Sequence, residues 1–276
     1  MAQTGKSSWA RIMAPLSGGK GDAQVLAAAA ELARPFDAEV AGVYAPADVA
    51  DLMPWMGEGF MGGVQITAVE SLKEAANLGE RNARAAVEAC PAARKGFTTL
   101  ESPVWASLAV ESRLSDVVVF DNEAARGRGP LAEAFQQLVA NEQRPMVIAR
   151  PGLQAEGVMA VAWDGGKEAT RATRTAMPLL EKASRVVILG APAASSRAFD
   201  PYRLKDFLGA RGIEADVEVI KESGDAASLL LNACRALGAS LLVSGAFGHA
   251  RLREFIFGGT TRSLLQAESP SLFLSH

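Results

Sequence analysis

The stretch that decides the fold is LLVSGAFGHARLREFIFGGTTRSLL, which runs from Leu241 to Leu265. It opens with an apolar run of strand character, passes through a glycine turn and a connecting segment, and reaches a second glycine turn where a helical pattern begins. Glycine lets the backbone adopt positive φ and approach a ligand closely, and a helix N-terminus presents free N–H groups to an anion. The pattern therefore predicts a cradle for a phosphate group or a nucleotide.

Length and composition limit the classes of protein to which the chain can belong. Its 276 residues suffice for about two domains. Hydrophobic residues make up 49%, and the net charge of -3 offers no general attraction to nucleic acid or to an anionic membrane. No apolar run reaches the ~18 residues of a membrane span, and the N-terminal segment lacks the apolar core of a signal peptide. We therefore expect a cytoplasmic protein without nucleic-acid or membrane partners.

The cysteines and histidines are too few and too scattered for a metal site of the usual His/Cys spacing. Cys90 and Cys234 lie far apart without a CxxC pair, and the only histidines are His249 and His276. Neither cysteine has an adjacent cluster of histidine or lysine that would activate it. We expect buried structural thiols, no disulfide framework and no metal ligands.

The chain repeats one order of elements. Apolar strands alternate with helical patterns, as in βαβ units around a parallel sheet. The SGGK turn at Ser17–Lys20 has its counterpart in the DGGK turn at Asp164–Lys167, and VVVF at 117–120 corresponds to LLVS at 241–244. The repeat predicts two domains, 1–151 and 152–276, joined near 151–157. Strands are expected at 10–15, 39–44, 97–100, 116–120, 146–149, 158–163, 186–189, 215–220, 241–243 and 272–274, and helices at 22–33, 66–90, 104–112, 130–143, 168–183, 204–210, 226–237 and from 262.

One hydrophobic segment interrupts this rhythm. Between Pro46 and Gly63 the chain fits neither a helix nor a strand, and it carries Met53, Trp55, Met56, Phe60 and Met61. One interpretation is an irregular crossover folded onto the sheet. The other is a Met/Trp flap over a ligand or a partner surface.

The tandem βαβαβ units and the spacing Gly245-x2-Gly248-x9-Gly258 resemble the universal stress protein family in its two-domain form. The resemblance covers nearly the whole chain. It implies an α/β fold of two tandem Rossmann-like (adenine nucleotide alpha hydrolase-like) domains, each a five-stranded parallel sheet flanked by helices. Members that bind ATP carry the pattern G-x2-G-x9-G-[ST] and an acidic residue at the end of strand one.

The resemblance assigns roles to residues of the second half. Asp164 matches the acidic residue expected near the ribose, and Gly245 and Gly248 match the glycines whose amides approach the phosphates. Gly258 matches the third glycine. The implied cofactor is ATP, with Mg²⁺.

The position after the third glycine departs from the pattern. The family has Ser or Thr there, whereas this chain has Gly259 followed by Thr260 and Thr261. Two alternatives stay open: one of these threonines takes the place of the hydroxyl at the helix start, or the phosphate contact rests on backbone amides alone.

The first half departs much further. Ser17 stands at the position of the acidic residue, and no G-x2-G follows its fourth strand. Asp121 and Glu123 would place negative charge where phosphates belong, although the turn at 126–129 (RGRG) partly restores a basic, glycine-containing loop. We expect this half to be degenerate as a nucleotide site.

Two functions remain open. The first is a stress-response protein that binds ATP in its C-terminal domain and acts as a regulatory or protective module. The second is a structural or interaction module of the same fold that binds no nucleotide and docks a protein partner through the Met/Trp-rich segment. No constellation of a general base, paired carboxylates and a nucleophile predicts catalysis, so slow ATP hydrolysis is the most we expect.

Assembly follows from the resemblance too. Family members commonly pair domains through their last strands, which here would join 146–149 to 272–274 in an intramolecular pseudo-dimer and remove two exposed sheet edges. A homodimer of the chain is a further expectation.

Overall fold

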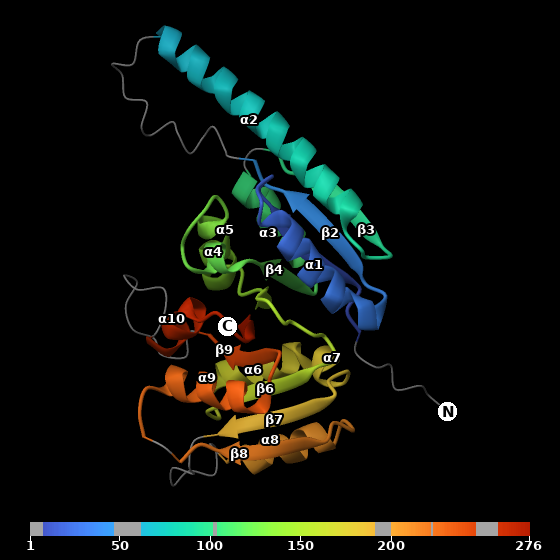
Figure 1. Cartoon of the computed structure of the whole chain (residues 1–276), viewed down its shortest axis with the longest axis vertical. Coiled ribbons are helices and arrows are strands. Elements are labelled where there is room, and N and C mark those ends of the chain that lie inside the picture. Colours follow the sequence, from blue (N-terminus) through green and yellow to red (C-terminus); the bar gives the residue numbers. More distant parts are fainter. Residues whose placement is uncertain (1–7, 47–61, 102–103, 191–199, 222, 247–258) are drawn as a thin grey trace.

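The computed structural model describes residues 8–46, 62–101, 104–190, 200–221, 223–246 and 259–276. Its strands form one ten-stranded sheet in the order β3-β2-β1-β4-β5-β10-β9-β6-β7-β8 (Figure 1). The strands are β1 Arg11–Leu16, β2 Glu39–Tyr44, β3 Lys95–Thr99, β4 Val117–Phe120, β5 Met146–Ile148, β6 Val158–Trp163, β7 Arg185–Gly190, β8 Ala215–Val219, β9 Leu241–Gly245 and β10 Ser271–Ser275.

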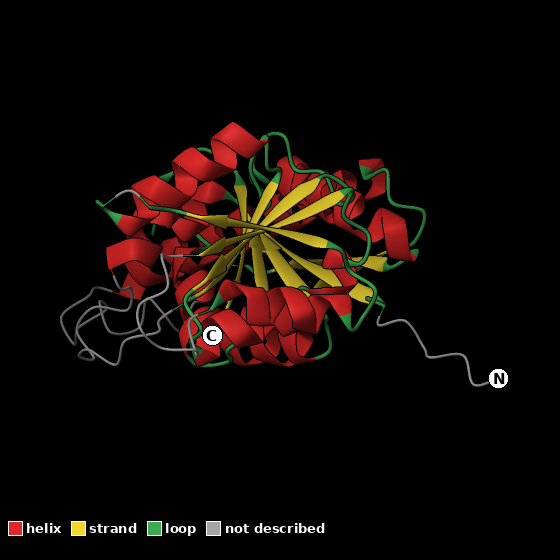
Figure 2. Cartoon of the chain, turned by 90° about the horizontal axis from the view of Figure 1, so that it is seen from below, coloured by secondary structure: helices red, strands yellow, loops and turns green. Residues whose placement is uncertain are grey.

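Helices cover both faces of this sheet, whose strands fan out by the usual twist when seen from one end (Figure 2). The α-helices are α1 Asp22–Ala33, α2 Gly62–Ala89, α3 Val104–Arg113, α4 Asn122–Ala125, α5 Ala132–Ala140, α6 Lys167–Thr175, α7 Met177–Leu180, α8 Pro201–Gly209, α9 Ala226–Leu237 and α10 Gly259–Gln266, and one 3₁₀ helix, η1, spans Arg34–Phe36. The expected α/β class with two similar halves is confirmed.

Each half is a parallel five-stranded sheet, and the halves meet through one antiparallel pair. In β5 and β10, Val147 lies opposite Phe273, and Ile148 opposite Leu272. This is the predicted pairing of the last strands. It gives the chain an intramolecular pseudo-dimer, and it leaves β3 and β8 as the two edges of a single continuous sheet.

The core lies in two layers, one on each face of the sheet. All residues of β4 are buried because a parallel sheet covered by helices has no solvent-facing side. Alternate residues serve alternate layers: Val119 packs in the layer that contains Phe273, and Phe120 packs edge-on against Phe135 in the other. Because strands of both halves contribute to each layer, the halves share their core.

Apart from shifts of a few residues at helix ends, two differences from the expected helices change the order of elements. The helix expected at 168–183 is divided into α6 and α7, since Pro178 lacks the N–H that a continuous helix needs. The short α4 was not expected; it begins after Asp121, whose Oδ1 accepts a hydrogen bond from the amide of Ala124 at 2.8 Å. Most of the Met/Trp-rich segment, residues 47–61, lies outside the described residues.

Candidate functional site

The candidate site lies at the carboxyl edge of the second sheet, between β6 and β9. These strands are parallel neighbours, with Val161 opposite Val243, and β7 lies on the other side of β6. The chain order therefore reverses between β6 and β9. Such a switch point opens a crevice at the carboxyl ends of the strands, which is where α/β sheets bind their ligands.

Asp164 follows β6 directly at this crevice. Its side chain is exposed, and its Oδ1 accepts a hydrogen bond from the amide of Gly166 at 2.8 Å. Gly165 between them has a φ of 72°, which is the left-handed conformation that this turn requires. Within the described residues this is the only hydrogen bond to the carboxylate, so one oxygen is held by the turn and the other is open to a ligand.

Gly245, the last residue of β9, makes a close contact with α6. A Cβ at this position would lie 2.6 Å from the amide nitrogen of Ala169 and 2.8 Å from Cβ of Glu168. Helix α6 therefore packs so tightly on the strand that only glycine fits. This packing is sufficient reason for the first glycine of the motif, whether or not its amide contacts a ligand.

Helix α10 begins at the second glycine turn. Among the described residues, no heavy atom lies within 4 Å of a Cβ built at Gly259, and the next residue, Thr260, is exposed, whereas Thr261 is buried. Of the two threonines, Thr260 is therefore the one whose hydroxyl is accessible at the helix start. Gly248 and Gly258 lie in the segment 247–258, outside the described residues.

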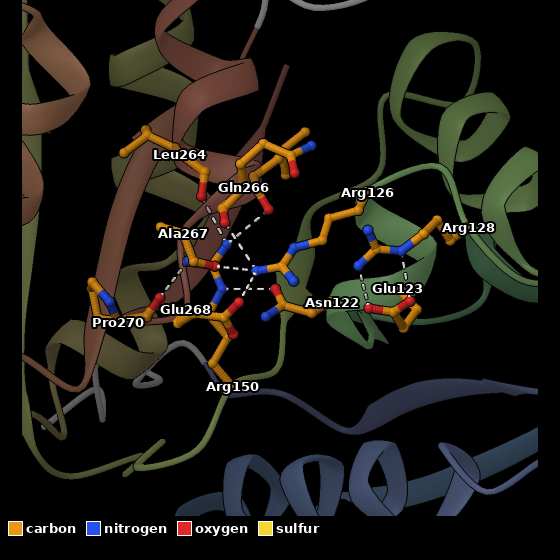
Figure 3. A network of polar contacts seen from close by, with 11 residues as sticks. Asn122, Glu123, Arg126, Arg128, Arg150, Leu264, Gln266, Ala267, Glu268 and Pro270 are labelled. Atoms are coloured by element: carbon orange, nitrogen blue, oxygen red, sulfur yellow. Dashed lines mark hydrogen bonds and ion pairs between the residues drawn. The ribbon is translucent and has the colours of Figure 1, made fainter.

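The C-terminal end of α10 is held by an arginine from the first half. Arg150, which follows β5, is buried and donates from Nη2 to the main-chain oxygen of Leu264 at 2.7 Å and from Nη1 to that of Pro270 at 2.6 Å (Figure 3). Its Nε donates to Oδ1 of Asn122 at 2.8 Å. Burial lowers the pKa of Arg150 to about 10, which leaves the guanidinium charged near neutral pH.

A second arginine supports the same end of the helix. Arg126 donates from Nη2 to the main-chain oxygens of Gln266 at 2.9 Å and Ala267 at 3.0 Å, and it pairs with Glu268 at 2.6 Å (Figure 3). Both arginines add donors to main-chain oxygens at and just after the end of α10, where a helix cannot pair all of its own carbonyl groups. No local pattern predicts these contacts, because donor and acceptor come from different halves of the chain.

The basic turn of the first half is thus used internally. Arg126 holds α10, and Arg128 pairs with Glu123 at 2.6 Å (Figure 3). The guanidinium of Arg128 lowers the pKa of the Glu123 carboxyl. Glu123 was expected to repel a phosphate and Arg128 to attract one. In the structure their charges neutralise each other.

An internal carboxylate occupies the corresponding turn of the first half. Asp22 is buried and accepts hydrogen bonds from the amides of Ser17 at 3.0 Å and Gly18 at 2.8 Å. Burial raises its pKa, and these amides act against that rise. The amides after β1 are therefore already bound to an anion of the chain itself.

Two further observations concern the residue next to Asp164 and the prospect of a metal site. The indole Nε1 of Trp163, the residue before Asp164, is buried and has no hydrogen-bond partner in the described part of the chain. The side chain of Trp163 packs against the core layer that contains Val161. In the same residues no group of three or more His, Cys, Asp and Glu is arranged to hold a metal ion.

The cysteines are both buried. Burial raises the pKa of the Cys234 thiol to about 12. Among the described helices none is long and apolar enough to cross a membrane.

Comparisons with known proteins agree with this architecture. The sequence model of the Universal stress protein family matches residues 158–272. A search of curated proteins found no match. Among solved structures, a universal stress protein from Archaeoglobus fulgidus DSM 4304 is similar, with a TM-score of 0.63 at 16% identity over 96% of this chain and 95% of that one. A functionally unknown protein from Pseudomonas aeruginosa PAO1 has a TM-score of 0.57 at 13% identity, over 97% and 92%.

These structural similarities establish the fold over the full length of the chain. The family model matches only the sequence of the second half. The sequence of residues 158–272 therefore matches the universal stress protein family, and the whole chain has the same fold as the solved universal stress protein from Archaeoglobus fulgidus.

Proposed function

We propose that this chain is a stress-response protein whose C-terminal half binds ATP or another adenine nucleotide, and that occupancy of this site alters its contacts with a protein partner. The observation that carries the proposal is the exposed carboxylate of Asp164, fixed by the amide of Gly166 at the switch point of the second sheet. A carboxylate so placed suits the hydroxyl groups of a ribose.

The other parts of the proposed site follow the family pattern. The hydroxyl of Thr260 and the free amides at the start of α10 would bind phosphate oxygens, with the dipole of the helix favouring negative charge. Gly248 and Gly258 would complete the loop around the phosphates. Mg²⁺ bound with the nucleotide would neutralise part of the phosphate charge.

Calorimetric titration of the full chain with ATP tests this proposal. We expect binding by the natural protein and, because Asp164→Asn removes a charged acceptor, an affinity loss of roughly tenfold in that variant. Asp216→Asn is the matched control: Asp216 is an exposed aspartate on β8 whose partner is Arg185. The absence of binding at millimolar ATP, or an equal loss in both variants, would contradict the proposal.

We further propose that the first half binds no nucleotide. Asp22 already binds the amides of Ser17 and Gly18, and the side chain of Asn82 on α2 donates to the main-chain oxygen of Gly18 at 3.3 Å. A second phosphate would meet like charge and a covered turn. The titration should therefore give one ATP per chain, whereas two would contradict this assignment.

The alternative is a structural or interaction module of the same fold that binds no nucleotide and docks a protein partner through the Met/Trp-rich segment. The contacts of Arg150 and Arg126 with α10 favour a structural role for the first half in either case. Catalysis is limited to slow ATP hydrolysis in this proposal. A homodimer stays a prediction, which light scattering of the purified chain would check.

A further inference from the structure

A groove lined by arginines lies where the two halves meet. Its volume is about 790 Å³, and its cationic side chains are Arg11, Arg113, Arg144, Arg171 and Arg174. The first three come from the first half and the last two from α6 of the second. The groove therefore concentrates positive charge in a chain whose net charge is -3.

Two of these arginines are neutralised by neighbouring carboxylates. Arg11 pairs with Glu111 at 2.8 Å, and Arg113 pairs with Glu142 at 2.6 Å. The one acidic residue of the lining, Asp116, accepts hydrogen bonds through Oδ2 from the amides of Ala10 at 2.6 Å and Arg11 at 3.0 Å. The side-chain carboxylates of Glu111, Glu142 and Asp116 are therefore already engaged in ion pairs or hydrogen bonds.

The other three arginines form no ion pair in the part of the chain that the structure describes, although the carboxylates of Asp116 and Glu142 lie near enough to Arg144 to favour its charged form. Within the described residues the side chains of Arg171 and Arg174 form no ion pair, and both are exposed, one turn apart on α6. Arg144 donates from Nη2 to the main-chain oxygen of Ser115, but its Nε is buried without a hydrogen-bond partner in the described part of the chain. A buried donor without an acceptor is costly.

The pseudo-symmetry of the chain provides an internal comparison. In the second half, Val158 opens β6 as Arg11 opens β1. Counted from the positive-φ glycines Gly18 and Gly165, the positions of Arg171 and Arg174 correspond to Gln24 and Ala27. The arginines of the groove are thus not required by the fold.

The opposite junction of the halves is built differently. There Arg34 is satisfied by two carboxylates, with Glu156 at 2.6 Å and Glu31 at 3.1 Å. Ion pairs neutralise Arg34 there, whereas Arg171 and Arg174 in the groove have no ion pair within the described residues.

We propose that this groove is a binding site for a small anion that carries several phosphate groups. The planar guanidinium fork matches phosphate oxygens in pairs, and three of them at one groove favour several phosphates over a single carboxylate. The volume lies within the range of small-molecule sites. None of Asp164, Gly245 and Thr260 lines the groove, so it is distinct from the proposed nucleotide site.

Calorimetric titration of the full chain with inorganic tripolyphosphate at low ionic strength tests the proposal. We expect the natural protein to bind it and the double variant Arg171→Ala/Arg174→Ala to bind it roughly tenfold or more weakly, because two charged donors are lost. Both residues are exposed, so the variant should fold. The matched control, Lys205→Ala/Arg211→Ala, removes two charges from exposed positions on and after α8 and should keep the affinity.

Two further arms separate this groove from other sites and ligands. Asp164→Asn/Thr260→Val should retain tripolyphosphate binding; its loss there would place the anion in the nucleotide site and overturn the proposal. Citrate should bind more weakly than tripolyphosphate, and equal affinity would overturn the phosphate assignment. Absence of binding by the natural protein, or unchanged affinity in Arg171→Ala/Arg174→Ala, would overturn the site itself.

Discussion

Gly18 and Gly79 are in direct backbone contact: a Cβ at Gly18 would lie 2.3 Å from Cα of Gly79. The backbone of the turn after β1 therefore packs directly against the backbone in the middle of α2, with no room for a side chain between them. Tyr44 closes the same contact, since its hydroxyl donates to the main-chain oxygen of Ala76 at 3.0 Å. This packing fixes α2 over the turn at Ser17–Lys20. The corresponding turn of the second half is the one that carries Asp164.

The contact predicts that Gly18→Ala is strongly destabilising. The substitution places a side chain at a φ of 76°, which costs roughly 1–2 kcal/mol, and drives it into backbone atoms, which costs about 1–3 kcal/mol more. Urea unfolding followed by circular dichroism measures the loss. Gly129→Ala is the control, because Gly129 has a φ of 77° and no atom within 4 Å of its Cβ position. Equal losses in the two variants would mean that the contact with α2 costs nothing to disturb.

Arg150→Met should destabilise the protein by about 3 kcal/mol. The variant removes the donor to the main-chain oxygen of Pro270 and leaves that of Leu264 with only the longer hydrogen bond from the amide of Ala267 at 3.3 Å, and a buried group that loses its donor costs roughly 1–3 kcal/mol. Arg128→Met removes the same chemical group from a half-exposed ion pair with Glu123 and should cost less than about 1 kcal/mol. Thermal and urea unfolding compare the two. A loss for Arg150→Met no larger than for Arg128→Met would show that the carbonyl groups find other donors.

Substitution by alanine should change the unfolding free energy in opposite directions at the two ends of the glycine motif. Gly245→Ala forces a Cβ to within 2.6 Å of the α6 backbone and should cost about 1–3 kcal/mol. Gly259→Ala adds a methyl group at the start of α10 that meets no atom of the described residues, and it should stabilise the protein by up to about 1 kcal/mol. Unfolding free energies of both variants test this, and a stable Gly245→Ala protein would contradict the packing role of the first glycine.

Asp22 should give the protein a distinctive dependence of stability on pH. Because burial raises its folded pKa above the ordinary value of about 3.9, the folded state binds this proton more tightly than the unfolded state does. The resulting stabilisation is present at low pH and is lost as pH rises through the folded pKa. Relative to Asp22→Asn, the natural protein should therefore gain stability as pH falls from neutral toward about 4.

The comparison with Asp22→Asn isolates that one group. Glu31 and Glu142 have lowered pKa values through their arginine partners and lose stabilisation on acidification, but they do so in both proteins. The difference in unfolding free energy, measured by urea titration at several pH values, cancels their effect. A difference that stays constant with pH would contradict the raised pKa of Asp22.

Much of the fold could be predicted because its information is local. The helices at 22–33 and 226–237 and the strands at 39–44 and 158–163 have the bounds that periodicity and turn residues indicate. The pairing of β5 with β10 followed from the family resemblance. In the site, the sequence identified Asp164 and the glycine turns, because residues that follow parallel strands reach one edge of the sheet.

The sequence by itself determined the order of elements, the duplication and the positions at the sheet edge. Only the tertiary structure decided that Gly245 serves the packing of α6, that Asp22 binds the amides of its own turn, that Arg150 holds α10, and that arginines of both halves line one groove. Periodicity and turn chemistry act over a few residues. These contacts join residues distant in the chain or depend on how two elements approach, and that geometry exists only once the sheet has formed.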